Sequence, residues 1–525
     1  MANNRQTPLR DNWKVILICG SVALSNCQYG FDTATMASFQ AMPGFLRVFG
    51  YPDPKLPNGW GIDTVSQQLM TSFLNVGTMI GVLFTALFGR YFGRRYGIWI
   101  GTLFCYAGCA IQIAATNVAQ LCAGRALLGV SNAYFMTFSN AYISECAPPH
   151  LRTILAGAFG LTSAVGSLLG AVVPMFTRDL QNKHSYQIGL ACLFFFPTLI
   201  SIVCFVIPES PRWLLVKGRT IEAEKALARL RGNSLRPDML EEEFVEMVRG
   251  IEEEKALAGS AAFTDLFKGT NLRRTIICIG AVTSRASAGF WVFLSYGAYF
   301  YQQAGIKDPF AMQLYKITGS IVGSALGIFL GHRFFGRRTI LLFGTAWAAI
   351  AMFAAALGGT IAPGSQASAK NFIAWSVVFG VLYSGFSSMI TWPISAEVVN
   401  SRLRLYSLSL ATGIDYIFAW LTAFTSPYFI NPKALNWGVR YCWIWAGSNA
   451  ITFVFFWFLL PEMKGRSLEE IDEMFEKRVP IRKFATYECE CTKQAHDLVV
   501  EKAKIAHTED IEKEAMENPK SGVSS

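Results

Sequence analysis

Charged residues are scarce in this chain. Asp, Glu, Lys and Arg make up 16% of its 525 residues, and hydrophobic residues make up 52%. An average soluble domain is about 25% charged. A composition this apolar excludes disorder over most of the chain and makes an ordinary soluble enzyme an unfavoured interpretation. A helix that crosses a bilayer needs about 20 mostly apolar residues, so roughly twelve such helices would occupy about 240 residues. The length therefore allows a large multi-pass membrane protein.

Motifs that carry enzyme chemistry are also missing. The chain has five His and no His/Cys/Asp set at metal-binding spacing, and it has neither a nucleophile elbow nor a P-loop. We therefore expect no metal, no cofactor and no enzymatic activity. Most of the twelve Cys lie in apolar runs, where a free Cys behaves as a small hydrophobe. The amino terminus lacks a signal-peptide pattern, because its first apolar run leads straight into a long membrane helix.

Long apolar runs appear in two sets. They begin near residues 13, 65, 97, 119, 153 and 187, and again near 273, 309, 338, 371, 404 and 440. The charged stretch 209–272 separates the sets and has helical charge spacing, which fits either a solvated linker or a cytoplasmic subdomain that braces the inner gate. We expect a cytoplasmic tail over 1–12, six-helix halves over 13–208 and 273–460, and a polar cytoplasmic tail over 461–525 whose last stretch is disordered.

Basic residues mark one side of the membrane. The formal charge is +10, and Arg94 and Arg95 follow the second run as Arg337 and Arg338 follow the eighth. Cytoplasmic loops are enriched in Lys and Arg, so an even number of spans places both termini in the cytoplasm, and the charge needs no nucleic acid to explain it. Lys316, near the outer end of the eighth run, is expected to snorkel.

The two sets of runs also repeat short motifs in the same order. The offsets are 336 − 93 = 243 for Gly-Arg-Arg, 397 − 145 = 252 for a Glu seven residues before an Arg, and 461 − 208 = 253 for Pro-Glu. A single match would mean little, but the ordered set indicates two related six-helix halves. Repeats of this kind are typical of transporters that rock about a central site.

Several strings resemble the sugar porter family of the major facilitator superfamily, and the overall look is that of its fungal branch. They are GFDTATM (30–36), GRYFGRR (89–95), GRALLG (124–129), YISECAPPHLR (142–152), PESPRWLL (208–215), AEVVNSRLR (396–404) and PEMKGRSLEE (461–470). The resemblance covers about residues 13 to 475. It implies an all-α major facilitator fold, with twelve transmembrane helices in two pseudo-symmetric halves and a cytoplasmic helical insert, which works by alternating access.

Asp32 is the first candidate functional residue. An acid at the centre of a membrane helix costs about 2.5–3.5 kcal/mol, so it normally has a partner or a role. In family members that resemble this chain, an Asp at this position couples transport to protons and pairs with the Arg of GRALLG, here Arg125. The alternative is a buried acid kept by one structural hydrogen bond.

A second group consists of loop charges that the positive-inside rule alone would explain. The resemblance implies more, namely salt bridges that lock the cytoplasmic side in the outward-facing state. The residues of this cytoplasmic gate are Arg94, Arg95, Glu145, Arg152, Glu209, Arg212, Arg337, Arg338, Glu397, Arg404 and Glu462.

The substrate site departs from the family pattern. Trp392 matches the Trp of the tenth helix that packs on sugar, with a lipid-facing or core Trp as the alternative. Family amides are replaced by Gly160, Arg285 and Asp415, and Trp291 and Tyr296 stand nearby in the seventh run. Neither new charge should face lipid. They form an ion pair with each other, or Arg285 binds a carboxylate or enolate while Asp415 binds a cationic or hydroxyl-rich ligand.

These observations predict a secondary active transporter of the fungal plasma membrane that acts as a monomer. It would move a sugar or a sugar-like polar metabolite as a proton symporter, with the proton as coupling ion and the bilayer as its surroundings. One rival keeps the fold but imports or exports a non-hexose specialised metabolite or polyol-like acid. Another is a nutrient sensor that does not transport, although sensors of this fold tend to have longer C-terminal tails.

Overall fold

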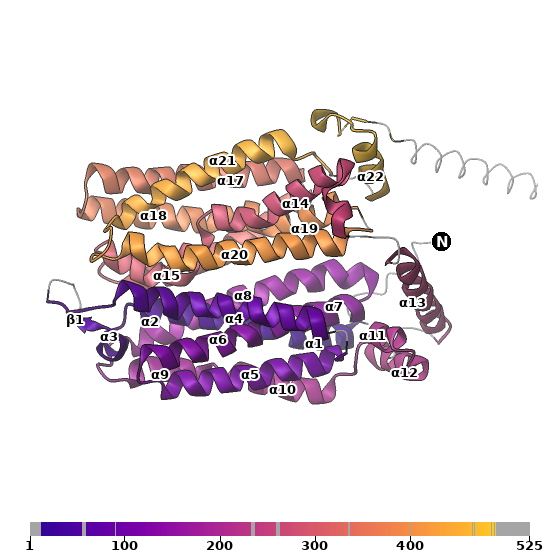
Figure 1. The fold of residues 1–525 in the computed structure, drawn as a ribbon, viewed down its shortest axis with the longest axis horizontal. Coiled ribbons are helices and arrows are strands. Elements are labelled where there is room, and N and C mark those ends of the chain that lie inside the picture. The colour runs from indigo at the N-terminus through magenta and orange to yellow at the C-terminus, as the bar shows by residue number, and fades with distance from the viewer. Residues whose placement is uncertain are drawn as a thin grey trace, which may run out of the picture.

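The computed structural model describes residues 12–54, 59–89, 91–232, 237–258, 263–333, 336–400, 402–464, 466, 468–484, 486–487 and 489. Nearly all of this chain is helical, and the helices form a bundle of long rods (Figure 1). In the N-terminal half the rods are α1 (Trp13–Ala23) with α2 (Ser25–Phe39), α4 (Thr64–Phe88), α5 (Arg94–Ala114), α6 (Val118–Tyr134) with α7 (Asn140–Cys146), α8 (Pro149–Thr177), and α9 (His184–Cys192) with α10 (Phe195–Val206).

The C-terminal half repeats this plan. Its rods are α14 (Gly269–Ser287) with α15 (Phe290–Gln303), α16 (Pro309–Arg333), α17 (Arg337–Ile361), α18 (Gln366–Leu382) with α19 (Met389–Val398), α20 (Arg404–Ile430), and α21 (Cys442–Leu459). Within the described residues, nine helical stretches are long and apolar enough to cross a membrane. Large apolar side chains such as Phe176 and Ile451 stay more than 70% exposed on the bundle surface, as expected where lipid replaces water.

α2 and α8 pack with their backbones in close contact. A Cβ atom added to Gly30 on α2 would lie 1.9 Å from the carbonyl oxygen of Ser163, and one added to Gly166 on α8 would lie 2.0 Å from that of Cys27. Small residues at such crossings are common between membrane helices, because they let two backbones approach. These glycines therefore fix the position of α2, which carries Asp32.

The fourth and tenth rods are interrupted by a π-helical turn. These turns are Phe135–Ser139 between α6 and α7, and Tyr383–Ser388 between α18 and α19. The offset between the turns is 383 − 135 = 248, and the offset between the starts of their rods is 366 − 118 = 248. A π-helical turn holds one extra residue and is frequent at functional sites, so the same irregularity recurs at the same depth in both halves.

Three helices of the middle segment lie at one end of the bundle: α11 (Pro211–Val216), α12 (Thr220–Arg231) and α13 (Pro237–Ala258) (Figure 1). Arg231 is 2% exposed, pairs with Glu243 at 2.5 Å and donates to the carbonyl oxygen of Cys146 at 2.9 Å. Since Cys146 ends α7, the insert is a packed helical unit on the N-terminal half, which favours a subdomain over a solvated linker.

At the same end of the bundle, α22 (Leu468–Glu476) packs on the C-terminal half (Figure 1). Asp472 forms an ion pair with buried Arg274 of α14, and the ring centroid of Phe475 lies 4.7 Å from the guanidinium carbon of Arg274. The sequence interpretation of this tail as simply polar missed this packing. The last stretch, which was expected to be disordered, lies outside the described residues. The opposite end of the bundle carries α3 (Pro43–Phe49) and a short pairing of β1 (Tyr51–Pro52) with β2 (Trp60–Gly61).

The expectation that Lys316 snorkels is wrong. Lys316 is 6% exposed, and its ammonium lies 5.2 Å from the ring centroid of Phe293. An aromatic face attracts a cation through its quadrupole, so this contact replaces part of the water that a snorkelling ammonium would reach.

Candidate proton and substrate site

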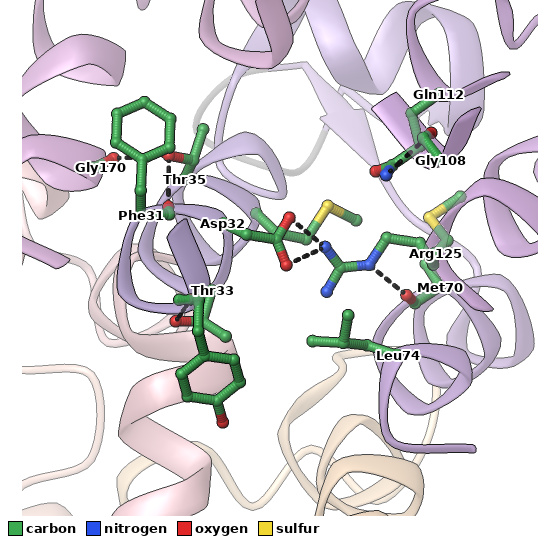
Figure 2. Close-up of polar contacts among 12 residues, drawn as sticks. Phe31, Asp32, Thr33, Thr35, Met70, Leu74, Gly108, Gln112, Arg125 and Gly170 are labelled. Atoms are coloured by element: carbon green, nitrogen blue, oxygen red, sulfur yellow. Dashed lines mark hydrogen bonds and ion pairs between the residues drawn. The ribbon is translucent and has the colours of Figure 1, made fainter. Parts of the chain in front are cut away.

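Asp32 and Arg125 form a buried ion pair inside the N-terminal half. The Nη1 atom of Arg125 donates to both carboxylate oxygens of Asp32, at 2.7 Å and 2.9 Å, and both side chains are 2% exposed. Figure 2 shows the guanidinium of Arg125 facing the carboxylate across the gap between α6 and α2. The Nε atom of Arg125 donates to the carbonyl oxygen of Met70 on α4 at 3.3 Å. The structure thus brings Asp32 and Arg125 together as predicted, and a backbone carbonyl of α4 also holds the Arg125 side chain in place.

A small cavity lies beside this pair, between the two halves. Arg125, Tyr29 and Thr33 line it from the N-terminal half, and Trp291 and Ser295 line it from the C-terminal half. Its volume of about 10 Å³ gives room for roughly one water molecule. No ligand much larger than water fits there in this conformation, so the halves would have to separate at this point to admit one.

The C-terminal half holds a second ion pair. The Nη2 atom of Arg285 on α14 lies 3.0 Å from Oδ2 of Asp415 on α20. Asp415 is 1% exposed, whereas the Arg285 side chain is 21% exposed. The two new charges found in the sequence therefore contact each other, and Arg285 is the more exposed of the two.

Aromatic side chains surround this second pair. The guanidinium carbon of Arg285 lies 5.2 Å from the ring centroid of Trp291 and 6.0 Å from that of Trp392. Trp392 is 40% exposed although it lies within a rod, and a Cβ added to Gly160 would meet no atom within 4 Å. Tyr296 differs, because it is fully buried and its hydroxyl donates to the carbonyl oxygen of Ala423. Tyr296 is thus committed to a backbone partner and has no exposed surface, unlike Arg285 and Trp392.

In the N-terminal half, the predicted gate charges form one network. Arg94 donates from Nε and Nη2 to Glu145 at 2.7–3.1 Å, and Glu145 also accepts from the Ser210 hydroxyl at 2.5 Å. Glu209 accepts from the backbone N–H groups of Arg95 and Ser210. Burial raises the pKa of Glu209, and these backbone hydrogen bonds offset part of that rise. Ser210, which starts the insert, is a member that sequence reasoning missed.

The C-terminal half repeats the arrangement. Arg337 forms an ion pair with Glu397, and the backbone N–H of Arg337 donates to Glu462 at 3.0 Å. Arg338 instead donates to the carbonyl oxygen of Trp457 at 2.8 Å. The remaining predicted members are half-buried Arg212 and Arg404, and Arg152, whose side chain lies outside the described part of the chain.

Polar contacts join described residues of the two halves mainly at the end of the bundle away from the insert. They are Arg178 to Asp308 at 2.5 Å, Asn431 Nδ2 to the Ile62 carbonyl at 2.9 Å, Gln40 Nε2 to the Ser295 carbonyl at 3.2 Å and, deeper in the bundle, Tyr416 to the Met136 sulfur at 3.0 Å. Arg178 follows α8, and Asp308 precedes α16. The sequence carried no signal for these contacts, because each one depends on how the halves meet.

Comparison with known proteins identifies the family. Residues 18–475 match the family model described as sugar (and other) transporter. The chain is 28% identical over 496 residues to the hexose transporter HXT11 of Saccharomyces cerevisiae, covering 92% of this chain and 86% of that protein. It is 30% identical over 472 residues to the general alpha-glucoside permease of the same yeast, covering 87% and 74%. The xylose transporter XylE of E. coli, in a partially occluded inward-open conformation, has a similar fold, with a TM-score of 0.70 at 18% identity over 87% of this chain and 100% of that one.

XylE is a member of the major facilitator superfamily, so this likeness shows the fold, while the match of the family model extends over most of the sequence. A multi-pass membrane protein with two related six-helix halves follows from both. The chain therefore belongs to the sugar transporter family and has the major facilitator fold.

Proposed function

We propose that this protein imports a sugar across the plasma membrane together with a proton, by alternating access. The observation that carries the proposal is the buried Asp32–Arg125 pair at the cavity between the halves. An ionised pair inside a membrane bundle is costly to keep and is most often functional. Relatives whose names state hexose or alpha-glucoside transport, and a structural neighbour described as a proton:xylose symporter, support the cargo class and the coupling ion.

Coupling follows from the charge of this pair. Protonation of Asp32 removes the negative charge that compensates Arg125, and an uncompensated buried charge is strongly destabilising. The protonated state therefore favours a different arrangement of α2, α4 and α6 from the one seen here. Because α2 and α4 line the cavity, proton binding and cargo access change together.

The structure represents the state that is closed to the outside. Polar contacts between the halves gather at the end away from the insert, and the insert end carries Arg94, Arg95, Arg337 and Arg338. Cytoplasmic loops carry the excess of basic residues, so we assign the insert end and both termini to the cytoplasm. The similar XylE structures in inward-open and partially occluded inward-open conformations support this assignment.

Removing the Arg178–Asp308 contact should favour opening to the outside. The pair is partly exposed, and exposed pairs contribute about 0–1 kcal/mol, so Asp308→Asn should shift the conformational equilibrium by up to about fivefold. Accessibility of a single cysteine placed in the outer half of the cavity measures the shift. Asp179→Asn is the matched control, because Asp179 is 93% exposed and lies 3.9 Å from the same Arg. Equal accessibility in the two variants would contradict a role in closure.

The same contact predicts a pH dependence. Burial alone would raise the pKa of Asp308, but hydrogen bonds from Arg178 and the Ala311 backbone outweigh it and hold the pKa below its usual value. A carboxylate with a lowered pKa stabilises the closed outer side fully above about pH 4, and the effect is lost as pH falls through the lowered value. The contribution of Asp308, measured as the difference in outer accessibility between the unmodified protein and Asp308→Asn, should therefore stay constant from pH 7 to pH 5 and disappear only in stronger acid.

Glu145→Gln should loosen the insert from the N-terminal half, because Glu145 holds both Arg94 and Ser210. Loss of a charged hydrogen-bond acceptor costs about 1–3 kcal/mol, so limited proteolysis within the insert should quicken several-fold. Glu397→Gln is the matched control, since its ion pair with Arg337 lies in the other half. Equal cleavage in the two variants would contradict this prediction.

Purified protein in proteoliposomes tests the proposed function. With an acidic exterior, a panel of hexoses, pentoses and sugar acids should yield at least one cargo that accumulates inside and stops accumulating when a protonophore collapses the gradient. Failure to accumulate any member of the panel would overturn proton-coupled sugar import. Accumulation that ignores the protonophore would overturn the coupling alone.

A further inference from the structure

The second ion pair, Arg285–Asp415, differs from the first in how completely its atoms are satisfied. Asp32 uses both carboxylate oxygens on Arg125, whereas Asp415 uses Oδ2 alone on Arg285. Nε of Arg285 is buried without a hydrogen-bond partner in the described part of the chain, whereas the Trp291 side chain serves Asp415 as a second hydrogen-bond donor. Buried polar atoms in native proteins are normally hydrogen-bonded, so orphaned ones point to a missing partner.

The exposure of the two side chains tells which of them meets that partner. Asp415 is 1% exposed and lies behind Arg285, which is 21% exposed. Trp392, whose ring is 6.0 Å from the guanidinium, is 40% exposed, and Trp291 lines the cavity between the halves. A partly exposed cation and a partly exposed aromatic face therefore lie side by side, next to Trp291 at the cavity between the halves.

The chemistry of these groups fits one kind of sugar. A neutral hexose offers hydroxyls, which both donate and accept, and amide side chains match them because they also do both. A guanidinium only donates, and its fork of N–H groups matches a carboxylate bidentately. The aromatic face of Trp392 suits the C–H groups of a pyranose ring. The guanidinium and the indole together therefore match a molecule that has both a sugar ring and a carboxylate.

We propose that the cargo is a sugar that carries a carboxylate, a uronic or aldonic acid, and that Arg285 binds this carboxylate while the ring packs on Trp392. Asp415 is a positioning residue, which holds the guanidinium between Trp291 and Trp392. This inference rests on the proposed import function and narrows its substrate class. At neutral pH the cargo carries one negative charge, so its passage with one proton moves no net charge.

Matched sugars test the binding. D-galacturonate and D-galactose differ at C6, where one has a carboxylate and the other a hydroxymethyl group, and D-glucuronate and D-glucose form a second such pair. Calorimetry on the purified full chain at pH 7 should show that a uronate binds at least tenfold tighter than its matched hexose. Equal or tighter binding of the hexoses, or no binding of any acid in a panel that includes D-gluconate, would overturn the proposal.

Variants locate the carboxylate. Arg285→Gln should weaken uronate binding by roughly 10- to 100-fold and so remove the preference for a uronate over its matched hexose, and Arg285→Lys should restore part of the loss. Asp415→Asn should lower uronate affinity less than Arg285→Gln does. It removes the carboxylate that positions the Arg285 guanidinium but leaves the guanidinium itself in place. Arg219→Gln, on the exposed insert, should have no effect, and the melting temperature of each variant reports folding. A uronate preference that survives in folded Arg285→Gln would overturn the assignment.

Transport separates this inference from the proposed function. Proton-coupled uptake of a uronate should respond to a pH gradient but not to a membrane potential imposed with potassium and valinomycin, whereas a neutral sugar carried with a proton would respond to both. Accumulation of hexoses but not of uronates would leave the proposed function standing and overturn the acid specificity. Uronate binding without proton-driven accumulation would leave the specificity standing and overturn the coupling.

Discussion

The Asp32→Asn variant should still exchange cargo across the membrane but should no longer accumulate it. A carboxamide resembles the protonated carboxyl, because it is uncharged and keeps an oxygen that can accept from Arg125, but it cannot take up and release a proton. A gradient of two pH units carries about 2.7 kcal/mol, which would drive roughly 100-fold accumulation with one proton per cargo. The variant should equilibrate at a ratio of about one.

Counterflow and net uptake in proteoliposomes measure these two activities separately. Asp179→Asn is a matched control, because it makes the same chemical change on a side chain that is 93% exposed, and it should accumulate cargo as the unmodified protein does. Concentrative uptake by Asp32→Asn would contradict the role of this carboxylate. Loss of exchange together with uptake, in a protein that melts normally, would point to a structural role for the pair.

Gly166→Val should prevent the N-terminal half from folding. The new Cβ would lie 2.0 Å from the carbonyl oxygen of Cys27. The positions of both atoms are fixed by the backbone, so no change of side-chain rotamer can relieve the clash. Overpacking of this severity costs about 3 kcal/mol or more, a large part of the stability of an ordinary domain. The expected result is aggregated protein with no cooperative melting transition.

The matched control lies on the same helix. Gly160→Val adds the same side chain to α8 where no atom lies within 4 Å of the new Cβ, so its melting temperature should stay within a few degrees of the parent. Melting curves and size-exclusion profiles of the two variants provide the measurement. Normal melting of Gly166→Val would show that α2 and α8 approach less closely than the structure indicates.

The sequence was informative where a motif is local. The strings around Asp32 and Arg125 led to a pair that the structure forms, and the repeated Arg and Glu motifs led to ion pairs within each half. For Asp32 the resemblance supplied the distant partner, which periodicity alone cannot do, and for the loop charges it supplied the set of residues without the pairing. The roles of these residues in coupling and gating stay predictions.

Other features depend on three-dimensional packing and could not be predicted from the sequence. Lys316 was assigned to the interface from its place near a helix end, but the ring of Phe293 holds it inside the bundle. Arg285 and Asp415 left two interpretations open, because 130 residues separate them and nothing local says whether their helices meet. The anchoring of α22 by Arg274 was equally invisible, since a charged amphipathic helix looks the same in a solvated tail.

The matching π-helical turns have a consequence for the history of the chain. Each begins 17 residues after the start of its rod, as 135 − 118 = 17 and 383 − 366 = 17. Two independent insertions would be free to fall at any position along these rods, whereas one insertion in an ancestral six-helix gene would be copied to both halves by duplication. One insertion before the duplication therefore accounts for both turns with a single event, whereas separate insertions would need the same position to be hit twice.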